Sequence, residues 1–258
     1  MFGEALMARE KPFATEADLC RRFLEGVAKE KGWTAYNEHA GWDILLVRRE
    51  DGFQIGIQAK LKLNLKVIEQ TVENFYSSPT SPGPDCRAVL VPDTEGLNES
   101  IASHIGITVI RVRPESKWFK QSSFEPALPT IKDKGWRDRW HEWCPTVRHK
   151  LPEYVPDVLA GKPAPTQLTD WKIKAMKIAI LLEKRGHVTR ADFKAIGIDH
   201  RRWLKPASWL VVEDGRYVAG NMPDFKGQHP TVYAQIVADH AKWMPALGAT
   251  IAKQGTML

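Results

Sequence analysis

Three polar side chains stand out because they interrupt strands whose other residues are apolar. Asp43 opens the run GWDILLV, and Gln58 and Lys60 close the run FQIGIQAK two residues apart. Side chains at i and i+2 of a strand lie on one face of a sheet, so Gln58 and Lys60 share a face. A carboxylate beside neutral oxygens suits a hard divalent cation, and a nearby lysine suits a phosphate. We therefore predict a Mg²⁺ (or Mn²⁺) site with Asp43, Gln58 and the Ala59 carbonyl as ligands.

The turn between the two runs predicts that Asp43 joins the other two. Asp51-Gly52 is a strong signal for a two-residue hairpin, because both residues tolerate the positive φ of primed turns. Such a turn places Asp43 opposite Lys60 and Leu45 opposite Gln58, and directly opposed side chains lie on the same face. The polar side chains then converge on one face of the sheet. A slip of one residue would separate them.

The elements that must carry these residues follow one another over the first 113 residues. An amphipathic pattern between Thr15 and Gly32 predicts a helix, and WTAYNE predicts a short strand before the hairpin. Helical patterns lie at 65–76 and 95–104, and short apolar runs typical of strands lie at 87–92 and 107–112. The sequence thus predicts an α/β domain, 1–113, with a mixed sheet and helices on its faces.

This order of elements, with Asp43 after a glycine and Gln58-x-Lys60 at the end of the next strand, resembles the PD-(D/E)XK nuclease superfamily. The resemblance covers roughly residues 13–113 and implies the restriction-endonuclease-like α-β-β-β-α-β core. It also implies a Mg²⁺-dependent endodeoxyribonuclease in which Asp43, Gln58 and Lys60 are catalytic. Glu16, on the first helix, is the best match for the additional acidic residue, and Glu25 is its competitor.

The sequence departs from the family pattern at Gln58, where most members carry Glu, and so removes one negative charge from the site. Some Gln-x-Lys branches are active, among them the endonuclease subunit of heteromeric cut-and-paste transposases, which also carries a C-terminal winged helix. Gln70 resembles a glutamine that some branches place near the active site. The structural alternative is a cross-strand ion pair between Asp43 and Lys60, worth about 0 to 1 kcal/mol if exposed.

Residues 114–168 change in character, because they are rich in proline and tryptophan. We interpret them as a connector that packs against a domain. Trp136, Trp140 and Trp143 fall at i, i+4 and i+7 of a predicted helix and would share one of its faces. Core packing or docking between domains explains such a stripe better than the stacking of nucleobases does.

Residues 169–258 are predicted to form a second, small α+β domain. Helical patterns at 169–186, 188–197 and 198–206 precede a hairpin at 209–220, which is the order of a winged helix-turn-helix domain. A helix of this kind enters the major groove or lies on phosphates. The residues that we expect to contact DNA are Arg190, Lys194, His200, Arg201, Arg202 and Lys205. Winged domains that bind only proteins are the alternative.

The cysteines and the hydropathy exclude several classes of protein. Cys20, Cys86 and Cys144 are scattered and odd in number, which predicts free buried thiols rather than a disulfide framework. Cys144 with His141 and His149 would supply only three zinc ligands. The sequence has no run of about 18 apolar residues and no apolar signal core, so we expect no membrane segment and a cytoplasmic location.

The charge is unevenly distributed between the two parts of the chain. Residues 1–113 carry a net charge of −2, and the remainder carries +8. This asymmetry predicts an anionic polymer such as DNA as the partner of the C-terminal part. We therefore expect a metal-dependent DNA endonuclease. The alternatives are a catalytically inactive DNA-binding protein on a nuclease scaffold and a protein-interaction module; a homodimer or a protein partner is compatible with each.

Overall fold

The chain folds into two compact units in a computed structural model that describes residues 12–73, 81–92, 97–115, 122–132, 134–161, 168–204 and 208–244. The first unit comprises residues 1–150 and 158–165, and the second comprises 151–157 and 166–258. The expected connector, 114–168, is therefore not a unit of its own. Most of it belongs to the first unit, and 151–157 belongs to the second.

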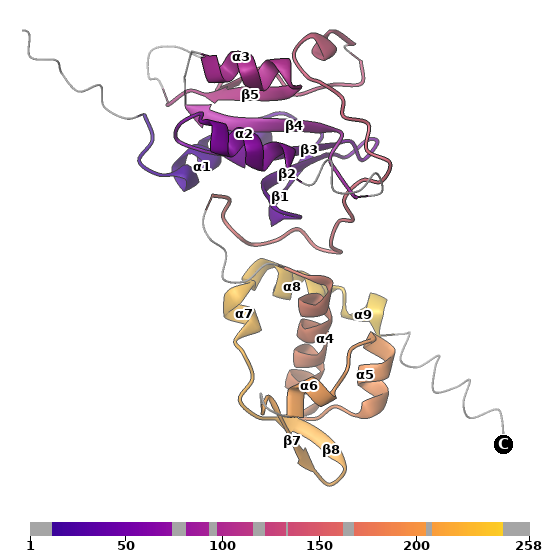
Figure 1. The fold of residues 1–258 in the computed structure, drawn as a ribbon. Coiled ribbons are helices and arrows are strands. Elements are labelled where there is room, and N and C mark those ends of the chain that lie inside the picture. Colours follow the sequence, from indigo (N-terminus) through magenta and orange to yellow (C-terminus); the bar gives the residue numbers. More distant parts are fainter. Residues whose placement is uncertain are drawn as a thin grey trace, which may run out of the picture. The chain divides into compact units, whose positions relative to one another are not determined.

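The first unit is built on a six-stranded mixed sheet whose strands lie in sequence order (Figure 1). Strands β1, β2 and β3 are antiparallel, β3, β4 and β5 are parallel, and β6 is antiparallel to β5. The predicted mixed sheet is thus confirmed. The strands are β1 (Trp33–His39), β2 (Trp42–Arg48), β3 (Gln54–Ala59), β4 (Cys86–Pro92), β5 (Ile107–Val112) and β6 (Phe124–Glu125). The last of these was not predicted.

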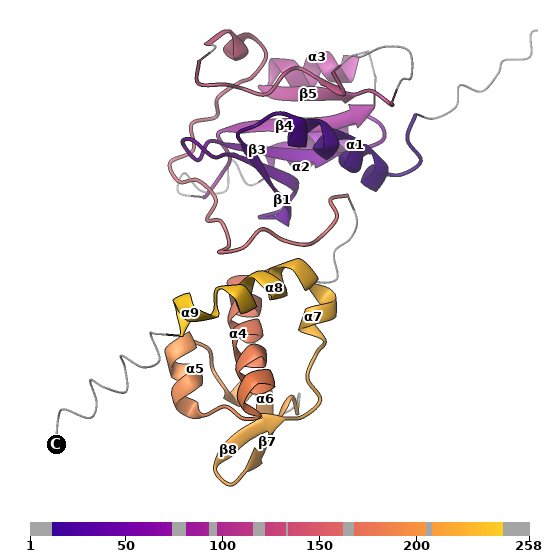
Figure 2. The same cartoon turned by 180° about the vertical axis from the view of Figure 1, so that it is seen from behind.

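Helices cover both faces of this sheet. Helices α2 (Leu65–Val72) and α3 (Leu97–His104) lie on one face, and α1 (Glu16–Lys29) lies on the other, as the two opposite views show (Figures 1 and 2). The Thr15 side chain caps α1 and forms a capping box with Asp18, and Asn64 caps α2. These caps satisfy backbone N–H groups that the first turn leaves without partners, so they fix where each helix begins.

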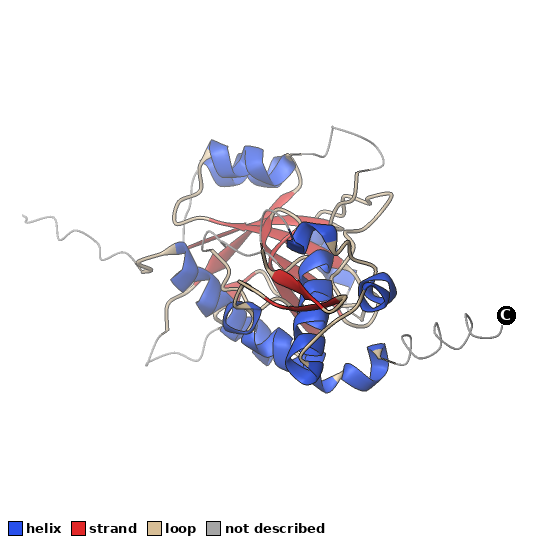
Figure 3. Cartoon of the chain, turned by 90° about the horizontal axis from the view of Figure 1, so that it is seen from below, coloured by secondary structure: helices blue, strands red, loops and turns tan. Residues whose placement is uncertain are grey.

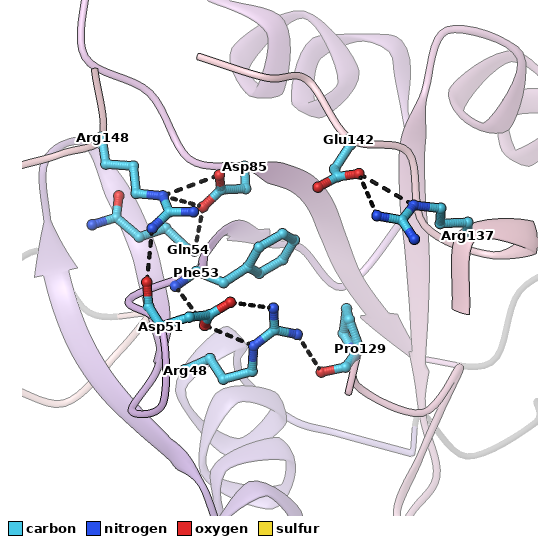
Figure 4. A network of polar contacts seen from close by, with 9 residues as sticks. All are labelled: Arg48, Asp51, Phe53, Gln54, Asp85, Pro129, Arg137, Glu142 and Arg148. Atoms are coloured by element: carbon cyan, nitrogen blue, oxygen red, sulfur yellow. Dashed lines mark hydrogen bonds and ion pairs between the residues drawn. The ribbon is translucent and has the colours of Figure 1, made fainter. Parts of the chain in front are cut away.

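The hairpin between β2 and β3 has a longer turn than we predicted. The Arg48 backbone N–H donates to the Phe53 carbonyl at 2.8 Å, and Ile44 lies opposite Ile57. The turn therefore contains residues 49–52, and the register differs by two residues from the predicted one. Asp51 explains the difference, because its carboxylate accepts hydrogen bonds from the Arg48 guanidinium and from the Phe53 backbone N–H (Figure 4).

The tryptophan-rich stretch is not the helix that we predicted. A 3₁₀ helix, η1 (Lys134–Asp138), ends before Trp140. Trp140 is 1% exposed in the core beneath α1, and its indole N–H donates to the Ala127 carbonyl at 2.9 Å. The Trp143 indole N–H donates to the Gly106 carbonyl at 2.9 Å. Core packing, the interpretation favoured by the sequence, is therefore confirmed for Trp140.

The second unit consists of helices and a two-stranded hairpin (Figure 3). Its elements are α4 (Asp170–Arg185), α5 (Arg190–Ile196), α6 (Arg201–Leu204), β7 (Leu210–Glu213), β8 (Arg216–Ala219), α7 (Phe225–Gln228), α8 (Pro230–Ala238) and α9 (His240–Trp243). Their order is the one predicted from the sequence as far as the hairpin. Asp157 accepts from the Val232 backbone N–H at the start of α8, at 2.8 Å, which explains why 151–157 belongs to this unit.

Two further expectations meet the structure. Cys20 and Cys86 are free and buried, as predicted, but Cys144 is free and exposed. Within the ranges that the structure describes, no helix is long and apolar enough to cross a membrane.

Candidate active site

The side chains of Glu16 and Lys60 meet where the first turn of α1 passes the end of β3. The Lys60 ammonium lies 2.9 Å from Glu16 Oε2, and each side chain is about one-third exposed (33% for Glu16 and 32% for Lys60). The capping box at Thr15 sets the first turn of α1, and hence the place of Glu16. Lys60 therefore pairs with the helix, not with Asp43 across the strands as the structural alternative required.

Glu25, the competitor of Glu16, lies elsewhere on α1. Its carboxylate pairs with Arg22 at 3.4 Å and is half exposed. The sequence-based preference for Glu16 thus agrees with the geometry.

Asp43 is joined to the end of the neighbouring strand. Its Oδ2 accepts a hydrogen bond from the Ala59 backbone N–H at 2.7 Å. Burial raises the pKa of the Asp43 carboxyl above its ordinary value; the Ala59 hydrogen bond and the charge of Lys60 oppose this rise, and the charge of Glu16 adds to it. Asp43 therefore lies within electrostatic reach of both Lys60 and Glu16.

Gln58 is held by both ends of its side-chain amide. It is 2% exposed, its Nε2 donates to the Gly41 carbonyl at 2.7 Å, and its Oε1 accepts from Gln70 Nε2 at 3.2 Å. Gly41 lies in the turn between β1 and β2 with a φ of 83°, which favours glycine. The turn thus presents a carbonyl that requires a donor at position 58.

The structure brings together Glu16, Asp43, Gln58 and Lys60, from α1, β2 and β3 (Figure 1). The predicted register was wrong by two residues, but a shift of two leaves every side chain on its predicted face. The apolar residues of β3 accordingly lie in the core against α1.

The oxygen atoms of this site suit a hard cation in kind but are few in charge. Glu16 and Asp43 supply carboxylates, Gln58 supplies an amide oxygen, and Ala59 has a backbone carbonyl, all of them donors that Mg²⁺ accepts. The described residues contain no group of three or more His, Cys, Asp or Glu side chains placed to hold a metal ion. The donor set therefore fits Mg²⁺ or Mn²⁺ with two negative charges, one fewer than a Glu at position 58 would give.

Two features beside the site were not found from the sequence. Cys20 is buried, and burial, together with the charges of Asp43 and Glu16, raises the pKa of its thiol, so it is not poised as a nucleophile. The segment 158–161 lies against the start of α1: the Gly161 N–H donates to Glu38 Oε1 at 2.9 Å, and a Cβ added at Gly161 would lie 2.9 Å from the Glu16 backbone carbon. No local sequence pattern marks either contact.

Comparisons of the chain with protein-family models, with curated proteins and with solved structures give no match. The fold and the geometry of the site therefore carry the functional argument alone.

The residues expected to contact DNA are arranged unevenly in the second unit. Arg190 donates to the Tyr217 hydroxyl at 3.0 Å, and the His200 ring stacks on Tyr217. Arg201 is exposed and pairs with Asp199 at 3.0 Å, and this pairing lowers the pKa of Asp199 to about 2. Lys194 and Arg202 are exposed. Helix α6 has four residues, fewer than predicted, and Lys205 lies outside the described residues.

The three residues considered as zinc ligands have other surroundings. The Trp42 indole N–H donates to His149 Nε2 at 3.1 Å, and burial is the main cause that lowers the pKa of His149 to about 4. The His141 ring lies edge-on to Trp143. Cys144 is exposed. These side chains form no metal-holding group among the described residues.

Proposed function

We propose that the protein is a metal-dependent DNA endonuclease. The observation that carries this proposal is the meeting of Glu16, Asp43, Gln58 and Lys60 at one edge of the sheet. Two acidic side chains that lie together and are held by different groups, one by a lysine and one by a backbone N–H, are suited to share a cation.

Asp43, Gln58 and the Ala59 carbonyl would hold Mg²⁺ or Mn²⁺, with Glu16 as the second carboxylate. The cation would supply positive charge that stabilises the phosphate in the transition state. Lys60 would donate to a phosphate oxygen or orient the attacking water. Its ammonium is held 2.9 Å from Glu16, so the ion pair keeps this donor at the site before substrate arrives.

The raised pKa of Asp43 supports a functional role for this carboxyl. A carboxyl that only stabilises the fold through an ion pair has a lowered pKa, because the folded state favours its charged form. Asp43 has the opposite shift, with burial as the main cause. Its charge is therefore a cost to the folded protein without a cation, as is common at sites selected for activity.

We infer that the second unit holds the DNA as a winged helix-turn-helix domain. The order of its elements and the net charge of +8 over residues 114–258 support this inference. Arg201, Arg202 and Lys194 are exposed, and each could contact phosphates.

The second candidate function is DNA binding without cleavage. It is favoured by the neutral Gln58 and by the Lys60–Glu16 ion pair, which lowers the charge available to a cation. A protein-interaction role is the third reading of the same scaffold, and an affinity for duplex DNA that is insensitive to salt would support it.

The test of the proposed function is cleavage of supercoiled plasmid and of a branched oligonucleotide with Mg²⁺ or Mn²⁺. We expect metal-dependent nicking that is lost in Asp43→Asn and in Lys60→Ala. Glu25→Gln is the matched control, because Glu25 is an acid on the same helix that pairs with Arg22. Nicking that persists in Asp43→Asn would refute the assignment, and DNA binding without nicking in the wild type would favour the second candidate.

A measurement without turnover separates the site from a structural role of Asp43. The folded state disfavours the ionised Asp43 carboxyl, so Asp43→Asn, which can still accept from Ala59, should raise the melting temperature in EDTA at pH 7. The same variant should lose the heat of Mn²⁺ binding in calorimetry. A lowered melting temperature with unchanged Mn²⁺ binding would identify Asp43 as a structural residue.

A further inference from the structure

Strand β7 has an edge that no other strand covers among the described residues. The sheet contains β7 and β8, and on the far side of β8 the Tyr217 backbone bridges to Val188. The opposite edge, that of β7, carries exposed apolar side chains: Val211 is 47% exposed and Val212 is 57% exposed. The hairpin projects from the helices at the end opposite α8 in both views (Figures 1 and 2).

The hydrogen bonds of the hairpin determine which backbone groups face this open edge. Gly220 N–H donates to the Trp209 carbonyl at 2.8 Å, and Glu213 lies opposite Arg216 at the two-residue turn. In an antiparallel pair, residues that bond to the partner strand alternate with residues whose N–H and C=O point away. Odd-numbered residues of β7 therefore bond to β8, and Leu210 and Val212 direct their backbone groups outward.

The chemistry of this edge suits a polypeptide strand rather than DNA. Its outward N–H and C=O groups match an extended backbone, and its exposed side chains are valines. The tip carries Glu213 and Asp214 with Arg216, and β7 has no lysine or proline of the kind that protects edge strands from pairing. Two acidic residues at the tip would be repelled by phosphates.

We propose that a second copy of this chain pairs through β7, so that the two hairpins form a continuous four-stranded antiparallel sheet. The sequence of the edge is self-complementary when Val211 faces its own counterpart across a two-fold axis. Leu210 of each copy then lies opposite Val212 of the other, and both are the residues with outward backbone groups. This register gives two hydrogen-bonded pairs and an apolar centre at Val211.

Other registers fit less well. Parity requires that residues 210 and 212 pair with even-numbered residues, so the register can move only in steps of two along the partner. A move toward the tip would bring Asp214 into the ladder, but its φ of 45° belongs to the turn and not to a strand. The proposed pairing is independent of nuclease activity, since it involves none of the residues of the candidate active site.

A contact of four residues per copy is small, and we expect a weak, transient dimer. A covalent trap is therefore the appropriate experiment. In the Cys144→Ser background, Val211→Cys would place two thiols in a non-hydrogen-bonded antiparallel pair, where Cβ atoms lie about 4.5 to 5.5 Å apart, close to the disulfide range. Arg216→Cys, exposed on the other strand of the hairpin, is the matched control.

Under mild oxidation of the full chain, we expect the V211C protein to form disulfide dimers about tenfold faster than the R216C protein, because pairing raises the local concentration of the two thiols. Adding Val212→Lys should abolish this difference, since it places a charge on the edge without touching the core. Equal dimer formation by V211C and R216C, or a rate that V212K does not change, would overturn the proposal. Circular dichroism would verify that each variant is folded.

Discussion

Gln58→Glu is the substitution that the family resemblance makes most attractive, and the structure predicts that it fails. A Glu at this position would add a negative ligand and would be expected to strengthen metal binding. In the structure, however, Gln58 Nε2 donates to the Gly41 carbonyl at 2.7 Å, and the side chain is 2% exposed. A carboxylate there would place two acceptor oxygens against each other in a buried position.

The size of the effect follows from the two ways in which the protein can respond. An ionised carboxylate would lose the hydrogen bond and remain buried without a partner, at a cost of about 3 to 5 kcal/mol. Alternatively, the carboxyl could take up a proton and donate it to Gly41. For an acid with an ordinary pKa of about 4.3, protonation at pH 7 costs about 3.7 kcal/mol. We therefore expect a loss of about 2 to 4 kcal/mol in the free energy of unfolding.

The pH dependence gives this prediction its sign. The substituted carboxyl would have a raised pKa in the folded state, so the destabilisation is greatest above that pKa and disappears as the pH falls toward about 4. Urea unfolding in EDTA of wild type and Gln58→Glu, at pH 7.5 and 4.5, measures it. Gln70→Glu, which adds a charge at an exposed neighbour, is the control and should change stability by less than about 1 kcal/mol. Equal stability of Gln58→Glu and wild type at pH 7.5, with tighter Mn²⁺ binding, would refute the reasoning.

Three further substitutions test other parts of the molecule. Gly161→Ala should cost about 1 to 2 kcal/mol in urea unfolding, because φ is 74° and the added Cβ would meet the α1 backbone at 2.9 Å; an unchanged midpoint would contradict this. The pKa of His149 is lowered to about 4, so wild-type stability should fall between about pH 6.5 and 4 as His149 gains a proton and can no longer accept from Trp42; His149→Gln should flatten that profile in thermal melts. Arg202→Ala should reduce the salt slope of DNA binding by about one unit in fluorescence titrations, whereas Arg216→Ala on the hairpin should leave it unchanged.

The elements that could be predicted from the sequence are those set by local signals. Thr15 caps α1, Thr189 caps α5, and a glycine in the left-handed conformation ends α4 at Gly186. Each signal acts within one helical turn, so it can be recognised without knowledge of the fold.

The elements that could not be predicted depend on partners distant in sequence. The tryptophan stretch has a helical period, yet Trp140 bonds to the carbonyl of Ala127 and Trp143 to that of Gly106, 37 residues away. These contacts, together with burial in the core, outweigh a local helical preference. The role of Gly41 is likewise invisible in the sequence, because the residue acts through a carbonyl that every amino acid possesses.

The site could be predicted in spite of a wrong register, and the reason is one of parity. Asp51 lengthened the turn by two residues, from two to four, because its carboxylate bonds to Arg48 and to the Phe53 backbone. A change of two moves Asp43 along the partner strand and keeps it on the face of Gln58 and Lys60, whereas a change of one would have turned it into the core. Alternation of apolar residues along β2 and β3 excludes the change of one, since it would bring polar side chains beneath α1. The apolar pattern therefore determines which side chains can meet, and the turn determines only how closely they oppose each other.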